Sequence, residues 1–152
     1  MRALFFALVV SSAGVAHACE VSIESAWIRA APPGATMLAG YLRLSNAGDT
    51  AVAIKEVSSV NFARVEIHET QVVDGVSQMR ELETLTLPAK GSVELKPGGK
   101  HLMLISPSKS LKVGDSVVLT LSDLADCKIS ATVAVLKDQA PADSDHHHHH
   151  HH

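Results

Sequence analysis

Four residues of the 152-residue chain have side chains that could together bind a soft metal ion: His68, Met79, His101 and Met103. Of the ten histidines, seven form a C-terminal expression tag (146–152), and His17 lies in an N-terminal signal, so the mature domain keeps two. Two imidazoles and two thioethers form a neutral donor set that suits Cu(I). Mg²⁺ and Ca²⁺ prefer oxygen ligands, and methionine is not a usual zinc ligand.

The alternation of apolar and polar residues indicates which way these side chains point. In the segment 63–68, Val65 and Ile67 alternate with polar residues, so His68 is expected on the outer face of a strand. His101 and Met103 are two residues apart and share the outer face of a strand, while Leu102 and Leu104 point into the core. The Cα atoms of His101 and Met103 are then about 6.6–6.8 Å apart, near enough for both side chains to reach one ion. Met79 lies in a polar stretch where an apolar side chain gains little.

Each of these residue types also has a purely structural interpretation. A single surface histidine is usually only that, and methionine commonly fills gaps in a core. We expect Met37, beside the turn at 31–34, to fill such a gap, and Trp27 and Tyr41 to pack in the core or an interface. The four candidate ligands lie on faces or loops where burial alone would not require a histidine or a methionine. Metal binding is therefore the favoured interpretation for them.

The elements that must position these residues are short strands. Apolar residues recur with period two from residue 20 onward, and turn residues follow every eight to twelve positions. No segment has a sustained helical stripe. The pattern predicts one all-β domain over 19–139, a Greek-key sandwich or small barrel. Strands are predicted at 21–28, 41–45, 52–57, 63–68, 70–73, 76–80, 85–87, 92–95, 101–105, 116–121 and 128–136.

The ends of the chain indicate where the protein works. Residues 1–18 have a positive start, a short apolar run and an A-x-A site, which is typical of a secretory signal peptide. Residues 140–152 are a polar tail and the tag. No later stretch is long and apolar enough for a transmembrane helix. We therefore expect a periplasmic protein without a transmembrane segment.

The two cysteines, Cys19 and Cys127, leave two interpretations open. Cleavage after residue 18 would make Cys19 the first mature residue, as in lipoproteins, although the preceding residues fit a lipobox poorly. A disulfide between Cys19 and Cys127 would suit an oxidising compartment, and it is the interpretation we favour. A free, buried Cys127 is the remaining alternative.

Composition excludes several classes of protein. The net charge of −3 and the pI near 6.3 give no electrostatic footprint for nucleic acid, and aromatic residues are too few to form stacking platforms. There is no C-x-x-C pair for thiol–disulfide chemistry and no hydrolase motif, so we expect no enzyme. A blue-copper centre would need a cysteine beside two histidines, which the position of Cys127 does not offer.

The spacing of the four candidate ligands closely resembles the H-x10-M-x21-H-x-M motif of the periplasmic copper chaperone family PCu(A)C. Flanking segments also match the family, namely 26–30 (AWIRA), 32–34 (PPG), 41–46, 68–70 (HET), 95–104 (LKPGGKHLML) and 114–115 (GD). The resemblance implies a cupredoxin-like barrel that binds one Cu(I) through His68, Met79, His101 and Met103. It further implies delivery to the binuclear copper site of cytochrome c oxidase or to another periplasmic copper protein.

Two departures from the family limit this expectation. Glu69 stands where many members have a second methionine, and the His- and Met-rich C-terminal extension of some members is absent. A second, Cu(II)-type site is therefore not expected. The main alternative function is a copper-buffering or resistance protein without a dedicated acceptor. A structural or adhesion module would fit the fold but not the four ligands.

Overall fold

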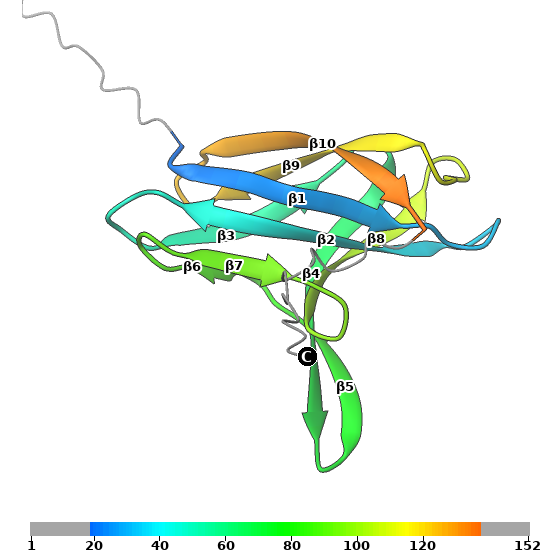
Figure 1. The fold of residues 1–152 in the computed structure, drawn as a ribbon, viewed down its shortest axis with the longest axis horizontal. Coiled ribbons are helices and arrows are strands. Elements are labelled where there is room, and N and C mark those ends of the chain that lie inside the picture. Colours follow the sequence, from blue (N-terminus) through cyan, green and yellow to red (C-terminus); the bar gives the residue numbers. More distant parts are fainter. Residues whose placement is uncertain (1–18, 138–152) are drawn as a thin grey trace, which may run out of the picture.

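The computed structural model describes residues 19–137, so the expected signal peptide and the tail with its tag lie outside the described residues. The described part consists of strands and connecting turns, and it has no helix that could cross a membrane. Ten strands follow one another along the chain (Figure 1): β1 (Val21–Arg29), β2 (Met37–Asn46), β3 (Val52–Ser58), β4 (Phe62–Val73), β5 (Val76–Glu81), β6 (Leu85–Leu87), β7 (Ser92–Leu95), β8 (Lys100–Pro107), β9 (Ser116–Asp123) and β10 (Lys128–Leu136).

Seven of these strands close into a barrel, in the order β4-β8-β2-β1-β10-β9-β3. The ring closes where Val57 of β3 pairs with Val65 of β4. Strands β5, β6 and β7 are added outside this ring and pair with β4, β3 and β2. The predicted all-β class is confirmed. One difference is that β4 runs unbroken over 62–73, where two strands were predicted.

The barrel interior is filled by apolar side chains that alternate with outward-facing residues. Leu102 and Leu104 of β8 are almost fully buried, and Ile28, Leu119 and Val135 fill the space from other strands. Burying a side chain of this size contributes about 1.5–3 kcal/mol. Because β8 must keep its leucines inside, His101 and Met103 are held on the opposite side of the strand.

Strands β4 and β5 form a hairpin that projects away from the barrel (Figure 1). Its turn is Asp74-Gly75, and both residues have positive φ (52° and 78°). Two positive φ values in a two-residue loop define a turn whose twist matches that of the strands, which favours Asp-Gly. The turn fixes the hairpin register, so that Met79 lies opposite Thr70 and Glu81 opposite His68.

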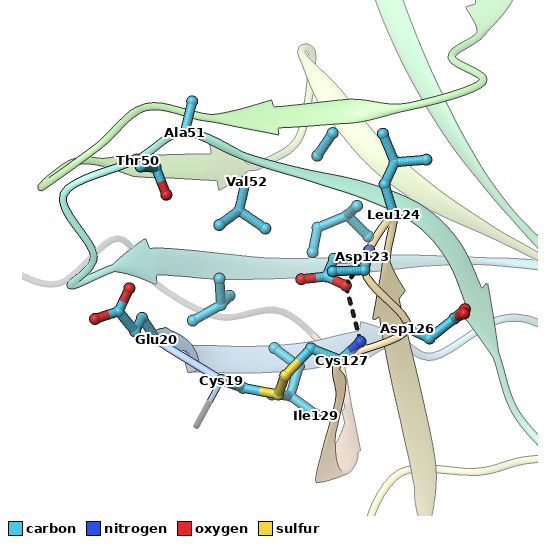
Figure 2. Close-up of a pocket in the computed structure, with 14 residues that line it drawn as sticks. Cys19, Glu20, Thr50, Ala51, Val52, Asp123, Leu124, Asp126, Cys127 and Ile129 are labelled. Carbon is cyan, nitrogen blue, oxygen red and sulfur yellow. Dashed lines mark hydrogen bonds between the residues drawn. A yellow bond between two sulfur atoms is a disulfide. The ribbon is translucent and has the colours of Figure 1, made fainter. Parts of the chain in front are cut away.

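Cys19 and Cys127 are joined by a disulfide in the structure, with Cα atoms 5.8 Å apart. The bond lies beside an open groove of about 700 Å³, lined from the start of β1, from β3 and from the β9–β10 turn (Figure 2). No residue of β4, β5 or β8 lines this groove. A sulfur in a disulfide has no thiol left to bear a lipid, so the disulfide and lipid modification of Cys19 exclude each other.

Candidate metal centre

Three adjacent strands, β5, β4 and β8, bring the candidate ligands to one surface. His68 of β4 lies directly opposite His101 of β8, and Met103 lies opposite Glu66. Residues two apart on a strand, and residues directly opposite on its neighbour, point to the same side of a sheet. We call this surface the ligand face; its members are Glu66, His68, Met79, Glu81, His101 and Met103.

His101 is the most enclosed of the candidate ligands, with 7% of its surface exposed. The sequence pattern had placed it on an outer face, where exposure was expected. It lies directly opposite His68 of β4, which is itself largely enclosed. The Nδ1–H of His101 donates to the carbonyl of Gly99 at 3.0 Å. That bond leaves Nε2 with the lone pair that a metal requires.

His68 has the complementary arrangement. Its Nε2–H donates to the Glu66 carboxylate at 2.8 Å, and its Nδ1 is buried with no hydrogen-bond partner. The centroids of the two imidazole rings are 6.0 Å apart. Two histidines can share an ion at this separation when each places one nitrogen about 2.0–2.1 Å from it. Each ring therefore keeps one nitrogen available to a metal, at a ring separation that a shared ion allows.

The two methionines sit at different depths on the ligand face. Met103 is half-buried and lies two residues from His101. Met79 is 53% exposed on the projecting hairpin, diagonal to His68. Diagonal neighbours on a sheet have Cα atoms about 7–8 Å apart, within reach of long side chains. Methionine also has three rotatable bonds. Met79 can therefore approach an ion held by His68.

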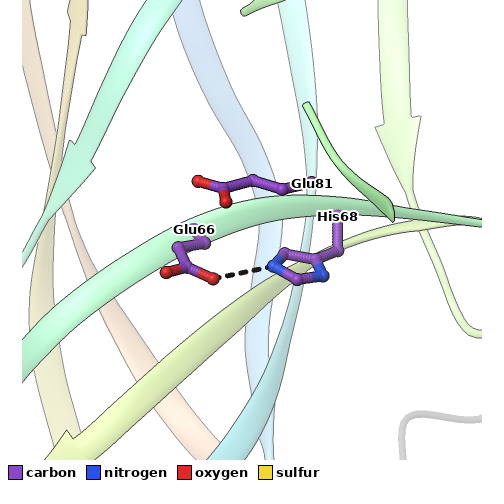
Figure 3. Close-up of side chains that lie close together, drawn as sticks. All are labelled: Glu66, His68 and Glu81. Atoms are coloured by element: carbon purple, nitrogen blue, oxygen red, sulfur yellow. Dashed lines mark hydrogen bonds and ion pairs between the residues drawn. The ribbon is translucent and has the colours of Figure 1, made fainter. Parts of the chain in front are cut away.

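Two acidic residues of this surface had not been predicted to take part. Glu66, His68 and Glu81 each offer a ligand atom, and these atoms all lie within 4.8 Å of one another (Figure 3). Glu66 also pairs with Arg64, and the hydrogen bond from His68 holds the pKa of Glu66 below its usual range. Glu66 could have been found from its position two residues before His68, whereas Glu81 required the hairpin register.

Two further expectations can be compared with the structure. Met37 does not fill a core gap: it is 53% exposed and lies opposite Ile105, on the same side of the sheet as Met103. Trp27 and Tyr41 are buried, as expected, with ring centroids 4.7 Å apart. The guanidinium of Arg29 covers both rings, at 5.7 and 5.4 Å from their centroids.

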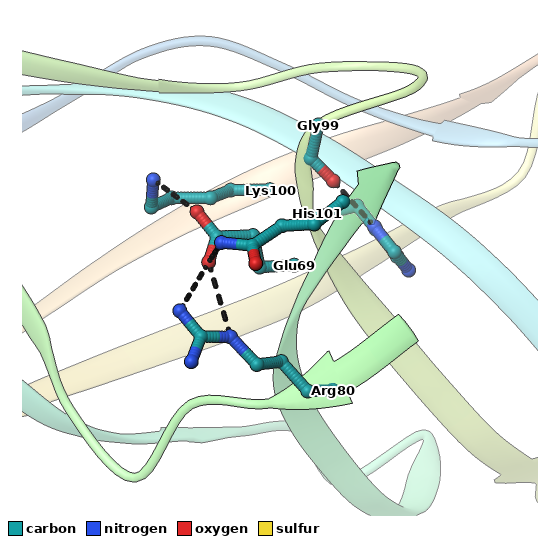
Figure 4. Close-up of polar contacts among 6 residues, drawn as sticks. Glu69, Arg80, Gly99, Lys100 and His101 are labelled. Carbon is teal, nitrogen blue, oxygen red and sulfur yellow. Dashed lines mark hydrogen bonds and ion pairs between the residues drawn. The ribbon is translucent and has the colours of Figure 1, made fainter. Parts of the chain in front are cut away.

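Glu69 faces away from the ligand face and ties three strands together (Figure 4). Its carboxylate accepts bonds from Lys100 Nζ and Arg80 Nη2, each at 2.8 Å. Lys100 is the start of β8 and Arg80 belongs to β5, so the contacts fasten the base of the hairpin to the barrel. The bond from Lys100, followed by that from Arg80, lowers the pKa of Glu69 to about 2.

This arrangement makes a pH-dependent prediction. The Glu69 carboxylate should stay ionised in the folded protein until the pH approaches about 2, against an ordinary value of 4.5. Because the folded-state pKa is depressed, the ion pairs contribute stability that is fully present above the unfolded pKa and is lost as the pH falls toward the folded one. The difference in unfolding free energy between wild type and Glu69→Gln should therefore shrink as the pH falls from 4.5 to about 2. Carbon-13 NMR of the Glu69 carboxyl group measures its titration midpoint directly. That midpoint should be higher in the Arg80→Ala variant. A wild-type midpoint near 4.5 would contradict the prediction.

Solved structures with the same fold define the class of protein. The copper-bound PCuAC domain from PmoF2 is 26% identical, with a TM-score of 0.65, over 78% of this chain and 94% of that domain. The Cu(I) form of DR1885 from Deinococcus radiodurans is 27% identical, with a TM-score of 0.62, over 76% of this chain and 77% of the other. The barrel, with its paired histidines and adjacent methionine, is a PCuAC domain of the cupredoxin-like type.

The particular family follows from the sequence match over the same barrel. Residues 21–135 match the model of the family described as "Putative lipoprotein LpqE-like", and the chain belongs to this family. The family is of the PCuAC type. A curated relative, the "Putative lipoprotein Lxx21020" of Leifsonia xyli subsp. xyli, is 29% identical over 127 residues, which is 83% of this chain and 75% of the relative.

Proposed function

We propose that this protein is a periplasmic carrier of Cu(I) that delivers the ion to the binuclear copper site of cytochrome c oxidase. One Cu(I) is bound by His68, Met79, His101 and Met103. The observation that supports the proposal best is the direct pairing of His68 with His101 on one side of the sheet, each with an uncommitted ring nitrogen and with Met103 alongside. The copper-bound relatives of the same fold add to it.

The donor chemistry agrees with a carrier. Imidazole and thioether are neutral and bind Cu(I) without the extreme affinity of a thiolate cluster, so the ion can be released to a partner. The exposed Met79 is the ligand that an acceptor would reach first. Exchange can then proceed one ligand at a time, with Met79 leaving before the buried His101. No bond of a substrate is made or broken in this scheme, and the protein is proposed not to be an enzyme.

The proposed location depends on the chemical state of Cys19 and Cys127, which are either joined by a disulfide or separated by a lipid on Cys19. A cleaved signal peptide would export the protein, and the disulfide that joins Cys19 to Cys127 in the structure would be stable in the periplasm. We propose that the mature protein moves freely there. The lipoprotein name of the family fits the alternative of a lipid on Cys19, which would remove the disulfide.

A transfer experiment tests the function. Tag-free protein loaded with one Cu(I) is mixed with the metal-free soluble copper domain of cytochrome c oxidase under reducing conditions. The two proteins are then separated and their copper is measured. We expect the copper to move to the oxidase domain, and we expect more rapid transfer than from a small-molecule Cu(I) complex of equal affinity. If the copper stays with this protein, delivery to the oxidase is excluded and a buffering or resistance role becomes the better proposal.

A further inference from the structure

We infer that the ligand face holds a second donor set, in which Glu66, His68 and Glu81 bind a divalent ion such as Zn(II) or Cu(II) in place of Cu(I). The inference shares His68 with the proposed Cu(I) site but otherwise depends on different atoms. It concerns an activity that the four-residue set of histidines and methionines does not provide.

The geometry of the three residues is that of a small site. Their ligand atoms all lie within 4.8 Å of one another, and Glu66 Oε2 is already 2.8 Å from His68 Nε2. A divalent ion would bind His68 Nε2 in place of the hydrogen that this nitrogen donates to Glu66, and the neutral ring would then carry its hydrogen on Nδ1. Metal–ligand bonds of about 2.0–2.2 Å place tetrahedral ligand atoms about 3.4 Å apart, so the Glu66–His68 pair would open and wider separations would close around the ion. Three protein ligands leave one tetrahedral position open for water or another molecule.

The sheet register places a carboxylate beside each thioether of the Cu(I) set. Glu66 lies directly opposite Met103, and Glu81 is two residues from Met79 on the same side of β5. His68 lies between them, opposite both Glu81 and His101. The face therefore offers soft sulfur and hard oxygen at adjacent positions around one imidazole.

The charges distinguish the two kinds of ion. Two carboxylates balance the charge of a divalent ion, and carboxylate with imidazole is an ordinary combination for Zn(II) and Cu(II). Two neutral thioethers suit a soft monovalent ion instead. Glu66 is held in place by Arg64 and His68, and 14% of its side chain is exposed, so it is partly preorganised for an ion. Cu(I) would then be held by the histidines and methionines, and Cu(II) by Glu66, His68 and Glu81.

Zinc titration of the tag-free protein tests the inference, because zinc does not change oxidation state. Isothermal titration calorimetry should show one Zn(II) bound to the wild type. Glu81→Gln and Glu66→Gln should each weaken it at least about tenfold, since even losing the outer hydrogen-bond partner of a ligand costs about 10–100-fold. Glu83→Gln is the matched control: Glu83 is an exposed glutamate just past the end of β5, and its loss should leave zinc binding unchanged. Glu81→Gln should also leave Cu(I) affinity unchanged.

Two further measurements separate this inference from the proposed function. Met79→Leu and Met103→Leu should weaken Cu(I) but not Zn(II), and Cu(I) added to the zinc form should release the zinc because the two sets share His68. Wild-type zinc affinity in Glu81→Gln would overturn the second donor set, whatever the copper results. Loss of zinc binding only in His68→Ala and His101→Ala would also overturn it, since the imidazoles alone would then hold the ion. Thermal unfolding of each variant verifies that it is folded.

Discussion

His101→Ala protein, freed of its tag, should bind Cu(I) at least about a hundredfold more weakly than the wild type, a loss of about 2.8 kcal/mol. The loss should be large because His101 is buried with Nδ1 committed to Gly99, so its Nε2 is preoriented and no exposed side chain can replace it. Met103→Leu keeps the volume but removes the sulfur, and should weaken Cu(I) more than Cu(II). Equilibrium competition with a Cu(I) chelator measures both effects.

The chain supplies a matched control for the methionine variants. Met37 is as exposed as Met79 and lies on the same side of the sheet as Met103, but it is outside the proposed ligand set. Met37→Leu should therefore bind Cu(I) as the wild type does. Undiminished affinity in all four single variants, His68→Ala, Met79→Ala, His101→Ala and Met103→Ala, would exclude the site and with it the carrier function.

Replacing both cysteines, in Cys19→Ser/Cys127→Ser, should lower the free energy of unfolding by up to about 4–5 kcal/mol. The disulfide joins residues 108 positions apart, and closing a loop of about 100 residues restricts the unfolded chain by about this amount in the chain-entropy model. Urea unfolding of the variant and of the oxidised wild type gives the difference. Copper binding should survive because neither cysteine is on the ligand face.

The state of the natural cysteines can be checked separately. Thiol titration of the denatured but unreduced wild type should find no free thiol. Two free thiols would exclude the disulfide, and the serine variant should then be about as stable as the wild type. A lipid adduct in the mass of Cys19 would instead support the lipoprotein interpretation.

Much of the fold could be predicted because its determinants are local. Period-two alternation identifies strands, and Asp74-Gly75 specifies a tight hairpin turn through its backbone preferences. Alternation also shows which side chains share a face of one strand, and His68 and His101 were correctly placed opposite the apolar faces of β4 and β8. These inferences need no knowledge of which strands are neighbours.

The rest depended on the order and register of strands far apart in sequence. Alternation cannot show that β8 pairs with β4 and brings His101 opposite His68, and it cannot show that His101 is buried. It cannot place Met37 outside the core. Such pairings are set by contacts across the whole barrel. The glutamates of the ligand face could have been found by local reasoning, because Glu66 is two residues before His68 and the Asp74-Gly75 turn sets Glu81 opposite it.

The free edge of β5 has a consequence for solubility. An edge strand presents unpaired backbone groups that can join the sheet of another molecule, and flat apolar edges promote aggregation. All six residues of β5 are exposed, which leaves this edge open. Its charged residues, Arg80 and Glu81, lie on opposite sides of the strand and oppose such pairing. The polar composition of β5 therefore opposes edge-to-edge pairing at the strand where Met79 is accessible.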